Sequence, residues 1–172
     1  MLKLIGSVLL VLAFSLAGFQ YAKRYRERPE QIRQLRTAIT FLETEIGYGV
    51  RTLPEALAQV SLRAPVPIRD LLERCSKSLL ELDGRSTYEC LQFAVKQRWK
   101  WTQMQSDEKE IFLDICKNLG QSDRNTQIQH LTLAKQNLEQ IEQQAQEEQR
   151  QYEKMYRTLG ILAGALLIIL LY

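Results

Sequence analysis

The chain has 172 residues, of which 45% are hydrophobic and 25% charged, and its formal net charge is +3. This length suits one domain, with or without membrane segments, and the small net charge gives no indication of a nucleic-acid partner. Apolar residues are concentrated at the two ends, which excludes a plain soluble globule, a disordered chain and a multi-pass transporter. Eight Gly and four Pro are too few to favour a turn-rich β fold.

The first apolar stretch covers residues 4–22 and carries no charge. As a helix, its 19 or so residues span about 28 Å, which is close to the thickness of a bilayer core. A cleaved signal peptide is the alternative, because Ser15-Leu16-Ala17 resembles a cleavage site. A basic cluster that resists translocation follows at Lys23, Arg24, Arg26 and Arg28. Residues 1–22 are therefore predicted to form an uncleaved transmembrane helix.

The second apolar stretch covers residues 159–172, and as a helix it spans only about 21 Å. Met155 and Tyr156 can add a turn, with Lys154 and Arg157 reaching the headgroups. A core helix of a soluble domain is the alternative. However, residues 161–171 are apolar on every face, and a domain this small cannot bury such a helix. We predict a short C-terminal transmembrane helix.

The basic residues also predict the orientation of the chain in the membrane. They follow the first segment and precede the second, whereas only Lys3 and the amino terminus lie outside the hairpin. The positive-inside rule then places residues 23–158 in the cytoplasm and both termini across the membrane. The residues expected to set this topology are Lys23, Arg24, Arg26, Arg28, Lys154 and Arg157.

The region between the two stretches is predicted to be an all-α bundle of roughly six helices. Its first helix is expected to begin at Pro29, with apolar residues spaced by three and four at Ile32, Leu35, Ile39, Leu42 and Ile46. Capping boxes at Thr52–Glu55 and Ser86–Glu89 predict two helix starts, and Pro65 and Pro67 predict a break. Further starts are expected near Ile68, Ser106 and Ser122.

The last helix is predicted to be unusually long. Its apolar stripe runs through Ile128, Leu131, Ala134, Leu138, Ile141, Ala145, Tyr152 and Met155. The Gln- and Glu-rich residues 136–151 indicate a solvated helix with one packed stripe, and the acids at Glu139, Glu142, Glu147 and Glu148 are expected on its solvated face. No breaker precedes Leu159, so this helix is expected to continue into the membrane.

No residue pattern indicates catalysis, a cofactor or a metal. The glycines never form a phosphate-binding loop, and the one histidine, His130, is expected to be a partly exposed helix residue. Cys75, Cys90 and Cys116 lie at apolar helical positions and are expected to be small buried side chains. Of two nearby tryptophans, Trp99 is expected in the core, and Trp101 on the surface, where it can also anchor an interface.

Gly160 and Gly164 form a GxxxG step inside the second apolar stretch. Small residues at this spacing allow two membrane helices to approach closely. The GxxxG step is equally compatible with packing of the two membrane segments within one chain and with packing between copies in a homo-oligomer.

Several segments together resemble the stage III sporulation protein AB family of endospore-forming bacteria, over nearly the full length. These segments are Ala22-Lys23-Arg24-Tyr25, residues 29–36 (Pro-Glu-Gln-Ile-Arg-Gln-Leu-Arg), residues 42–46 (Leu-Glu-Thr-Glu-Ile), residues 53–57 (Leu-Pro-Glu-Ala-Leu), residues 119–123 (Leu-Gly-Gln-Ser-Asp) and residues 156–160 (Tyr-Arg-Thr-Leu-Gly). That family is similar in turn to the cytoplasmic domain of the type II secretion platform protein, which also has the Leu-Pro-Glu-Ala-Leu helix start.

The resemblance implies a non-enzymatic assembly protein in the outer forespore membrane, with its bundle facing the mother-cell cytoplasm. There it would meet a secretion-type ATPase and other membrane proteins of the same sporulation complex, and link that ATPase to a channel. This chain has one such domain, so the platform's stoichiometry does not transfer. A membrane-bound signalling or regulatory adaptor, with His130 or tyrosines modified, is the alternative.

Overall fold

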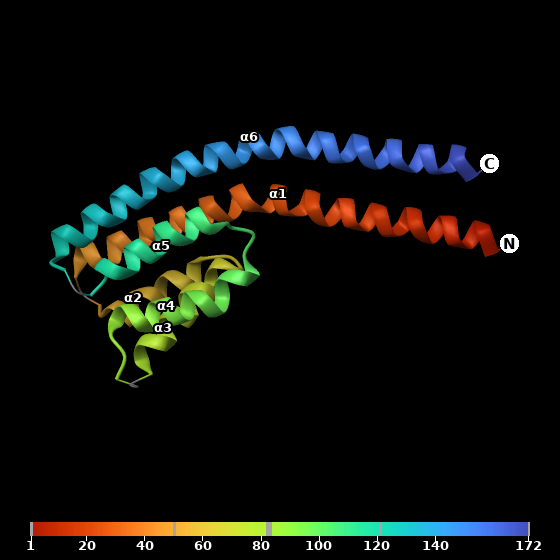
Figure 1. Ribbon diagram of the computed structural model, residues 1–172. Coiled ribbons are helices and arrows are strands. Elements are labelled where there is room, and N and C mark those ends of the chain that lie inside the picture. Colours follow the sequence, from red (N-terminus) through yellow and green to blue (C-terminus); the bar gives the residue numbers. More distant parts are fainter. Residues whose placement is uncertain (1, 50, 82–83, 121, 172) are drawn as a thin grey trace. The chain divides into compact units, whose positions relative to one another are not determined.

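The computed structural model describes the backbone at residues 2–49, 51–81, 84–120 and 122–171, and side chains at residues 23–49, 51–81, 84–120, 122–152, 155 and 158. Within these ranges all regular secondary structure is helical, as predicted (Figure 1). The elements are α1 (Leu2–Tyr48), α2 (Leu53–Arg63), α3 (Ile68–Leu80), α4 (Thr87–Arg98), the 3₁₀ turn η1 (Trp99–Trp101), α5 (Ser106–Asn118) and α6 (Arg124–Leu171).

The chain divides into two compact units. Unit 1 consists of Met1–Pro29 and Gln144–Tyr172, and unit 2 consists of Glu30–Gln143. Both long helices, α1 and α6, contribute residues to both units, whereas α2 to α5 belong to unit 2 alone.

Local signals place the helix ends of unit 2 where the sequence predicts them. At the start of α4, the Ser86 hydroxyl accepts from the Glu89 N–H at 3.3 Å, and the Glu89 carboxylate accepts from the Ser86 N–H at 2.8 Å. The predicted box at α2 likewise brings the Glu55 carboxylate to the Thr52 N–H at 2.9 Å, which lowers the pKa of Glu55. Gly49 follows α1 with φ +64°, a backbone conformation that side chains disfavour.

One predicted boundary is wrong. Pro29 does not begin a helix but lies inside α1, which extends to both sides of it. A proline has a φ angle compatible with a helix, so its main cost is one missing backbone N–H donor and a clash with the preceding turn. The apolar stripe that follows explains why the helix continues, because Ile32 and Leu35 are completely buried.

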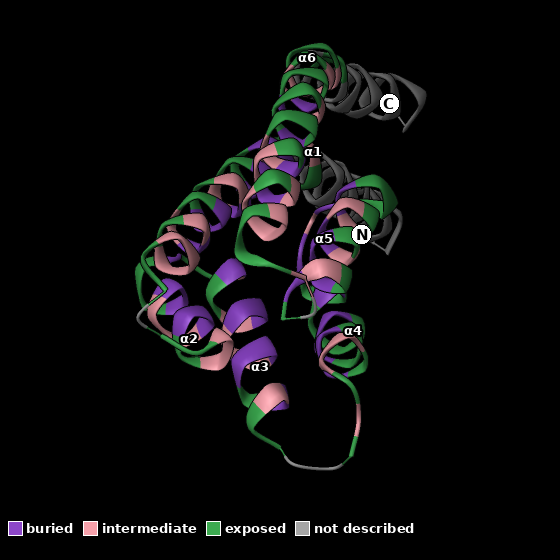
Figure 2. Cartoon of the chain, turned by 90° about the vertical axis from the view of Figure 1, so that its left-hand side faces the viewer, coloured by how far each residue is buried: buried purple, intermediate pink, exposed green. Residues whose placement is uncertain are grey.

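The core of unit 2 is apolar and comes from every helix of the unit. The stripe of α1 is buried at Ile32, Leu35, Ile39 and Leu42, and the stripes of α2, α3 and α4 are buried at Leu57, Ile68, Leu71 and Leu91. Buried positions recur along one side of each helix (Figure 2). In sequence order α2 packs on α3, α3 on α4 and α4 on α5. Trp99 stacks on Phe112 of α5, with ring centroids 6.2 Å apart.

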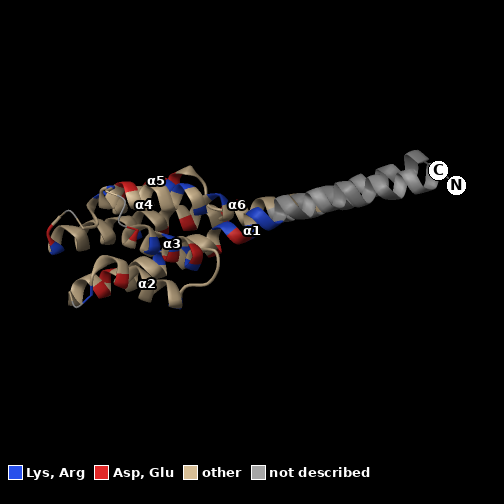
Figure 3. Ribbon diagram, turned by 90° about the horizontal axis from the view of Figure 1, so that it is seen from below, with Lys and Arg blue, Asp and Glu red and all other residues tan. Residues whose placement is uncertain are grey.

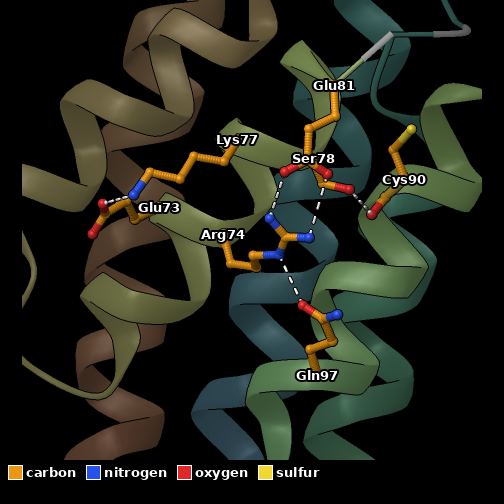
Figure 4. Close-up of polar contacts among 7 residues, drawn as sticks. All are labelled: Glu73, Arg74, Lys77, Ser78, Glu81, Cys90 and Gln97. Carbon is orange, nitrogen blue, oxygen red and sulfur yellow. Dashed lines mark hydrogen bonds and ion pairs between the residues drawn. The ribbon is translucent and has the colours of Figure 1, made fainter. Parts of the chain in front are cut away.

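Polar contacts join α3 to α4 around this core (Figure 4). The Ser78 hydroxyl is buried and donates to the Cys90 carbonyl at 2.9 Å. Arg74 donates to both carboxylate oxygens of Glu81 and, through Nε, to Gln97 on α4 at 2.8 Å. The hydrogen bond to a backbone acceptor offsets the desolvation cost of the buried hydroxyl, and together these contacts favour one alignment of the two helices.

Among the described residues, no helix has the length and apolar character that crossing a bilayer requires. The two predicted transmembrane segments, residues 4–22 and 159–172, lie outside the residues whose side chains are described. Their membrane insertion therefore stays a prediction.

Candidate functional site

The predicted topology-setting basic residues behave differently from one another. Lys23, Arg24 and Arg26 are exposed in the first turns of α1 whose side chains are described, where blue segments follow the grey part of the helix in Figure 3. Lys23 makes a surface ion pair with Glu27, at 3.6 Å. Arg28 is instead 6% exposed. Lys154, Arg157, Gly160 and Gly164 lie outside the residues whose side chains are described.

Arg28 belongs to a polar contact inside unit 1. Its Nη1 atom lies 2.8 Å from the Oε2 atom of Glu148 on α6. One turn away, the rings of Tyr25 and Tyr152 stack with centroids 4.9 Å apart and an interplanar angle of 27°. Because residue numbers fall on α1 as they rise on α6, these two contacts define an antiparallel helix pair. The burial of Arg28 indicates a structural role for this cation in addition to any effect on topology.

A second set of contacts joins α1 to α6 inside unit 2. We call it the polar seam, and it consists of Arg36, Glu43, Thr132, Lys135, Glu139 and Glu142. The Arg36 Nη1 atom lies 3.3 Å from Glu139 Oε1 and 3.5 Å from Glu142 Oε2. Glu43 accepts from the Thr132 hydroxyl at 2.7 Å and is paired with Lys135. The seam therefore alternates charge between the two helices over two turns.

The electrostatics of the seam depend on partial burial. Burial of the Glu43 carboxylate raises its pKa, but the hydrogen bonds from Lys135 and Thr132 together outweigh this effect, and the pKa of Glu43 is lowered overall. Glu142 is 5% exposed. The expectation that Glu142 lies on a solvated face is thus wrong, whereas Glu139 and Glu147 are exposed as expected. Glu148 is half-buried in its contact with Arg28.

The seam residues have a sequence signal that periodicity alone does not reveal. Arg36 and Glu43 each follow a buried stripe residue of α1 by one or four positions, and Lys135 and Glu142 flank the stripe of α6 in the same way. Such flanking positions form interhelical ion pairs in paired helices. These flanking charges can be recognised as ion-pair partners only when α1 and α6 are known to pack against each other.

The cysteines and tryptophans lie where the sequence places them. All three thiols are buried and free, and burial raises the pKa of Cys75 to about 12 and that of Cys116 well above its usual value. The thiols of Cys75 and Cys116 therefore stay protonated and are poor nucleophiles. Trp99 is 7% exposed and Trp101 is 67% exposed, which confirms the predicted division between core and surface.

His130 is partly exposed, as expected, and lines an open hollow of about 480 Å³ between α5 and α6. The hollow has a mixed lining that includes Glu110, Asp114, Lys117 and the exposed Leu133. Within the described part of the chain, no group of three or more His, Cys, Asp and Glu side chains is placed to hold a metal ion.

Comparisons with known proteins agree with one another. The family model described as stage III sporulation protein AB matches residues 3–172. Stage III sporulation protein AB of Bacillus subtilis (strain 168) is 39% identical over 171 residues, which cover 99% of each chain. A solved structure of a stage III sporulation protein AB has 33% sequence identity and a TM-score of 0.68, and the match covers 73% of this chain and 98% of that one.

Proposed function

Because the chain belongs to the stage III sporulation protein AB family, we propose that it is a non-enzymatic, membrane-anchored assembly protein needed for endospore formation. In this proposal the helical bundle of unit 2 binds a secretion-type ATPase in the cytoplasm. The membrane segments bind the other membrane proteins of a secretion-like channel complex. The chain thereby links the ATPase to the channel.

The observation that carries this proposal is the shared use of α1 and α6. Unit 2 starts at Glu30 and stops at Gln143, and at both points the chain passes into unit 1 within an unbroken helix. The same two helices carry the apolar stretches at residues 4–22 and 159–172. A bundle attached to the bilayer by two helices, rather than by one flexible linker, suits a protein that holds a cytoplasmic partner at the membrane.

The chemistry of unit 2 supports an assembly role rather than a catalytic one. Its buried ionisable groups serve packing and helix ends: Glu108 accepts from the Gln105 N–H at 2.7 Å, and Glu142 lies beside Arg36. The buried thiols of Cys75 and Cys116 are held in their protonated form. The family resemblance adds the location, which we propose to be the outer forespore membrane, with unit 2 in the mother-cell cytoplasm.

Co-purification tests the linking role. The full chain, tagged and replacing the resident family member in a sporulating bacterium, is extracted in mild detergent. We expect it to retain both the ATPase and the channel proteins. A variant whose residues 159–172 are replaced by an unrelated apolar membrane helix should keep the ATPase and lose channel proteins. Loss of both partners from the unaltered chain, while other membrane complexes survive extraction, contradicts the proposal.

Labelling of single cysteines tests the anchoring separately. In a chain with Cys75, Cys90 and Cys116 changed to Ala, cysteines are introduced at Leu2, Gln143 and Tyr172, one at a time. The chain is produced in vegetative cells, so that it inserts into the plasma membrane, and a membrane-impermeant maleimide added to intact protoplasts should label positions 2 and 172 and leave position 143 unlabelled. Labelling at position 143, or release of the protein by carbonate, would show that the predicted topology is wrong.

The alternative function, a signalling or regulatory adaptor, predicts a different effect of substituting His130. This side chain is partly exposed in the hollow between α5 and α6, so a modifying enzyme can reach it. His130→Ala should abolish sporulation if modification of His130 is the signal. The assembly proposal expects normal sporulation from His130→Ala, with Leu133→Ala as a control in the same hollow.

A further inference from the structure

We infer that one end of unit 2 is a docking surface for an anionic lipid bilayer. The surface is formed by the α2–α3 connection, residues 62–69, and by the η1 turn with its flanks, residues 96–105. We call it the basic aromatic end. The inference rests on the membrane anchoring in the proposed function, and it goes beyond it by giving unit 2 itself a lipid contact.

The two segments lie at the same end of unit 2, at the first turn of α1 within that unit. The Gln103 N–H donates to the Gln31 side-chain oxygen at 2.7 Å, which fixes residues 96–105 beside the point where the chain enters unit 2. Ala64 and Pro65 share a small hollow with Glu30 and Arg33. Figure 1 shows the α2–α3 and α4–α5 connections at this same end.

Exposed apolar side chains gather there. Trp101 is 67% exposed, although its neighbour Trp99 is buried, and Leu62 and Val66 are exposed on the other segment. Trp101 also holds the Lys100 ammonium over its ring, 5.6 Å from the centroid. An indole beside a lysine is the combination that membrane proteins place at headgroup level, because the ring is apolar and its N–H can stay hydrated.

The charge of these segments favours an anionic partner. Residues 62–69 contain Arg63 and Arg69, residues 96–105 contain Lys96, Arg98 and Lys100, and neither segment contains an acidic residue. Asp70 and Asp107 lie just beyond the two segments, so cations outnumber carboxylates at this end, and of the further acids Glu30 is paired with Arg33 and Glu73 with Lys77. Lys77, and to a lesser extent Arg98 and Arg69, lower the pKa of Glu73, so both arginines lie within electrostatic reach of that carboxylate.

A lipid surface fits better than a soluble acidic protein because of chain connectivity. The predicted membrane segment ends at Ala22, and Glu30 is the first residue of unit 2. Eight residues of chain reach at most about 28 Å in any conformation. The entry point of unit 2 therefore cannot lie far from the headgroups, where juxtamembrane cations attract anionic lipids.

Quenching of tryptophan emission by brominated lipid tests this surface. The full chain is reconstituted into mixed phosphatidylglycerol–phosphatidylcholine vesicles whose acyl chains are brominated close to the headgroup. We expect strong quenching, and we expect Trp101→Phe to lose most of it because Trp99 is buried. A matched variant combines Trp101→Phe with Leu80→Trp, which moves the exposed indole to the C-terminal end of α3, about 18 Å from Ile68. Its quenching should stay at the level of Trp101→Phe alone.

Charge and source of the ligand are tested in the same vesicles. Replacing Arg98 and Lys100 by Gln should lower the ratio of docked to undocked unit 2 roughly fivefold per charge. Vesicles of pure phosphatidylcholine should also lower this ratio, because they lack anionic headgroups. Added salt should weaken the quenching of the unaltered chain.

Carbonate-resistant flotation of each sample separates the two proposals. A chain that floats while Trp101 stays unquenched overturns the lipid surface and leaves the anchoring intact. A chain that does not float overturns both. If lipid does not quench Trp101 but added polyglutamate shifts its emission, the basic aromatic end binds an acidic protein. This result likewise overturns the proposed lipid-binding surface.

Discussion

Two parts of unit 2 are built on different physical principles. The contacts among α2, α3 and α4 bury aliphatic side chains, with Leu57, Ile68, Leu71 and Leu91 almost entirely inaccessible. The polar seam between α1 and α6 instead brings charged side chains together at its edge, with Arg36 partly exposed and Glu142 buried. Aliphatic burial favours any compact arrangement of about the right volume, whereas charges of alternating sign favour one register.

The difference separates stability from alignment. Burial of apolar area contributes roughly 1.5–3 kcal/mol for each large aliphatic side chain, so the core should dominate the free energy of unfolding. An ion pair contributes less, but breaking one partner of a buried pair is costly because the other charge stays desolvated. The seam is therefore expected to control how α1 and α6 align, at modest net stability.

The largest effect is expected where the backbone of the seam itself is broken. Ile141→Pro removes a helical N–H in α6 between Glu139 and Glu142 and costs about 3 kcal/mol or more. We expect loss of heat-resistant spores in a strain that depends on this chain, because both ion pairs of Arg36 are displaced together with the helix. Ile141→Ala keeps the helix and should sporulate nearly normally. Normal spore counts from the proline variant would show that an intact α6 is not required.

The second largest effect is expected for a substitution in the core, which lowers the stability of unit 2 and leaves the residues of the polar seam unchanged. Leu71→Ala leaves a cavity and should cost about 2–5 kcal/mol. The buried thiol of Cys75 provides the measurement, because a maleimide reacts with it only when unit 2 opens. Labelling should accelerate at least about 30-fold in the full chain in detergent.

Leu80→Ala is the matched control for that experiment, since Leu80 is 65% exposed on the same helix. Its labelling rate should stay within about twofold of the unaltered chain. Equal rates in the two variants would contradict an apolar core centred on α3.

The same comparison explains what the sequence could predict. Helix boundaries depend on neighbouring residues, so the Ser86–Glu89 capping box and the break at Pro65 and Pro67 could be placed correctly. Trp99 and Trp101 could be assigned to core and surface from helical periodicity. The position of Pro29 within its helix could not be predicted. A proline in the first turn of a helix and a proline inside a helix have the same backbone φ angle, and only long-range packing distinguishes them.

The charged contacts were beyond the reach of the sequence for a related reason. Glu142 lies in a run of Gln and Glu, which indicates a solvated face, and its burial depends on Arg36, 106 positions earlier. Arg28 likewise reads as one of several juxtamembrane cations until Glu148 is placed beside it. Partners so far apart in the chain leave no local signal, and each helix alone shows only that the charges flank its stripe.

Removing one charge of the seam should have an intermediate effect. Arg36→Leu takes the cation from the buried Glu142 and should cost about 2–4 kcal/mol, measured by urea unfolding of the full chain through Trp99 emission. The double variant Arg36→Leu with Glu142→Leu should recover most of this loss. Glu139→Gln, at the exposed partner, should cost less than about 1 kcal/mol. Additive losses in the double variant would mean that the two charges do not interact.

The smallest effect is expected at the other end of the seam and depends on pH. The pKa of Glu43 is lower in the folded chain than its ordinary value of 4.5, so the folded state favours the ionised carboxylate. The stability it contributes is complete above the unfolded pKa and is lost as the pH falls through the lower folded pKa. Glu43→Gln should therefore cost about 1 kcal/mol at pH 7 and progressively less below about pH 4.5.

Lys135→Met should reduce the same pH dependence, because it removes the main group that lowers the pKa of Glu43. Glu55, Glu73 and Asp123 also have lowered pKa values, but they stay unchanged in every variant, so their contribution cancels in the difference. A constant difference between Glu43→Gln and the unaltered chain from pH 7 to pH 3 would show that the seam holds Glu43 by geometry rather than by charge.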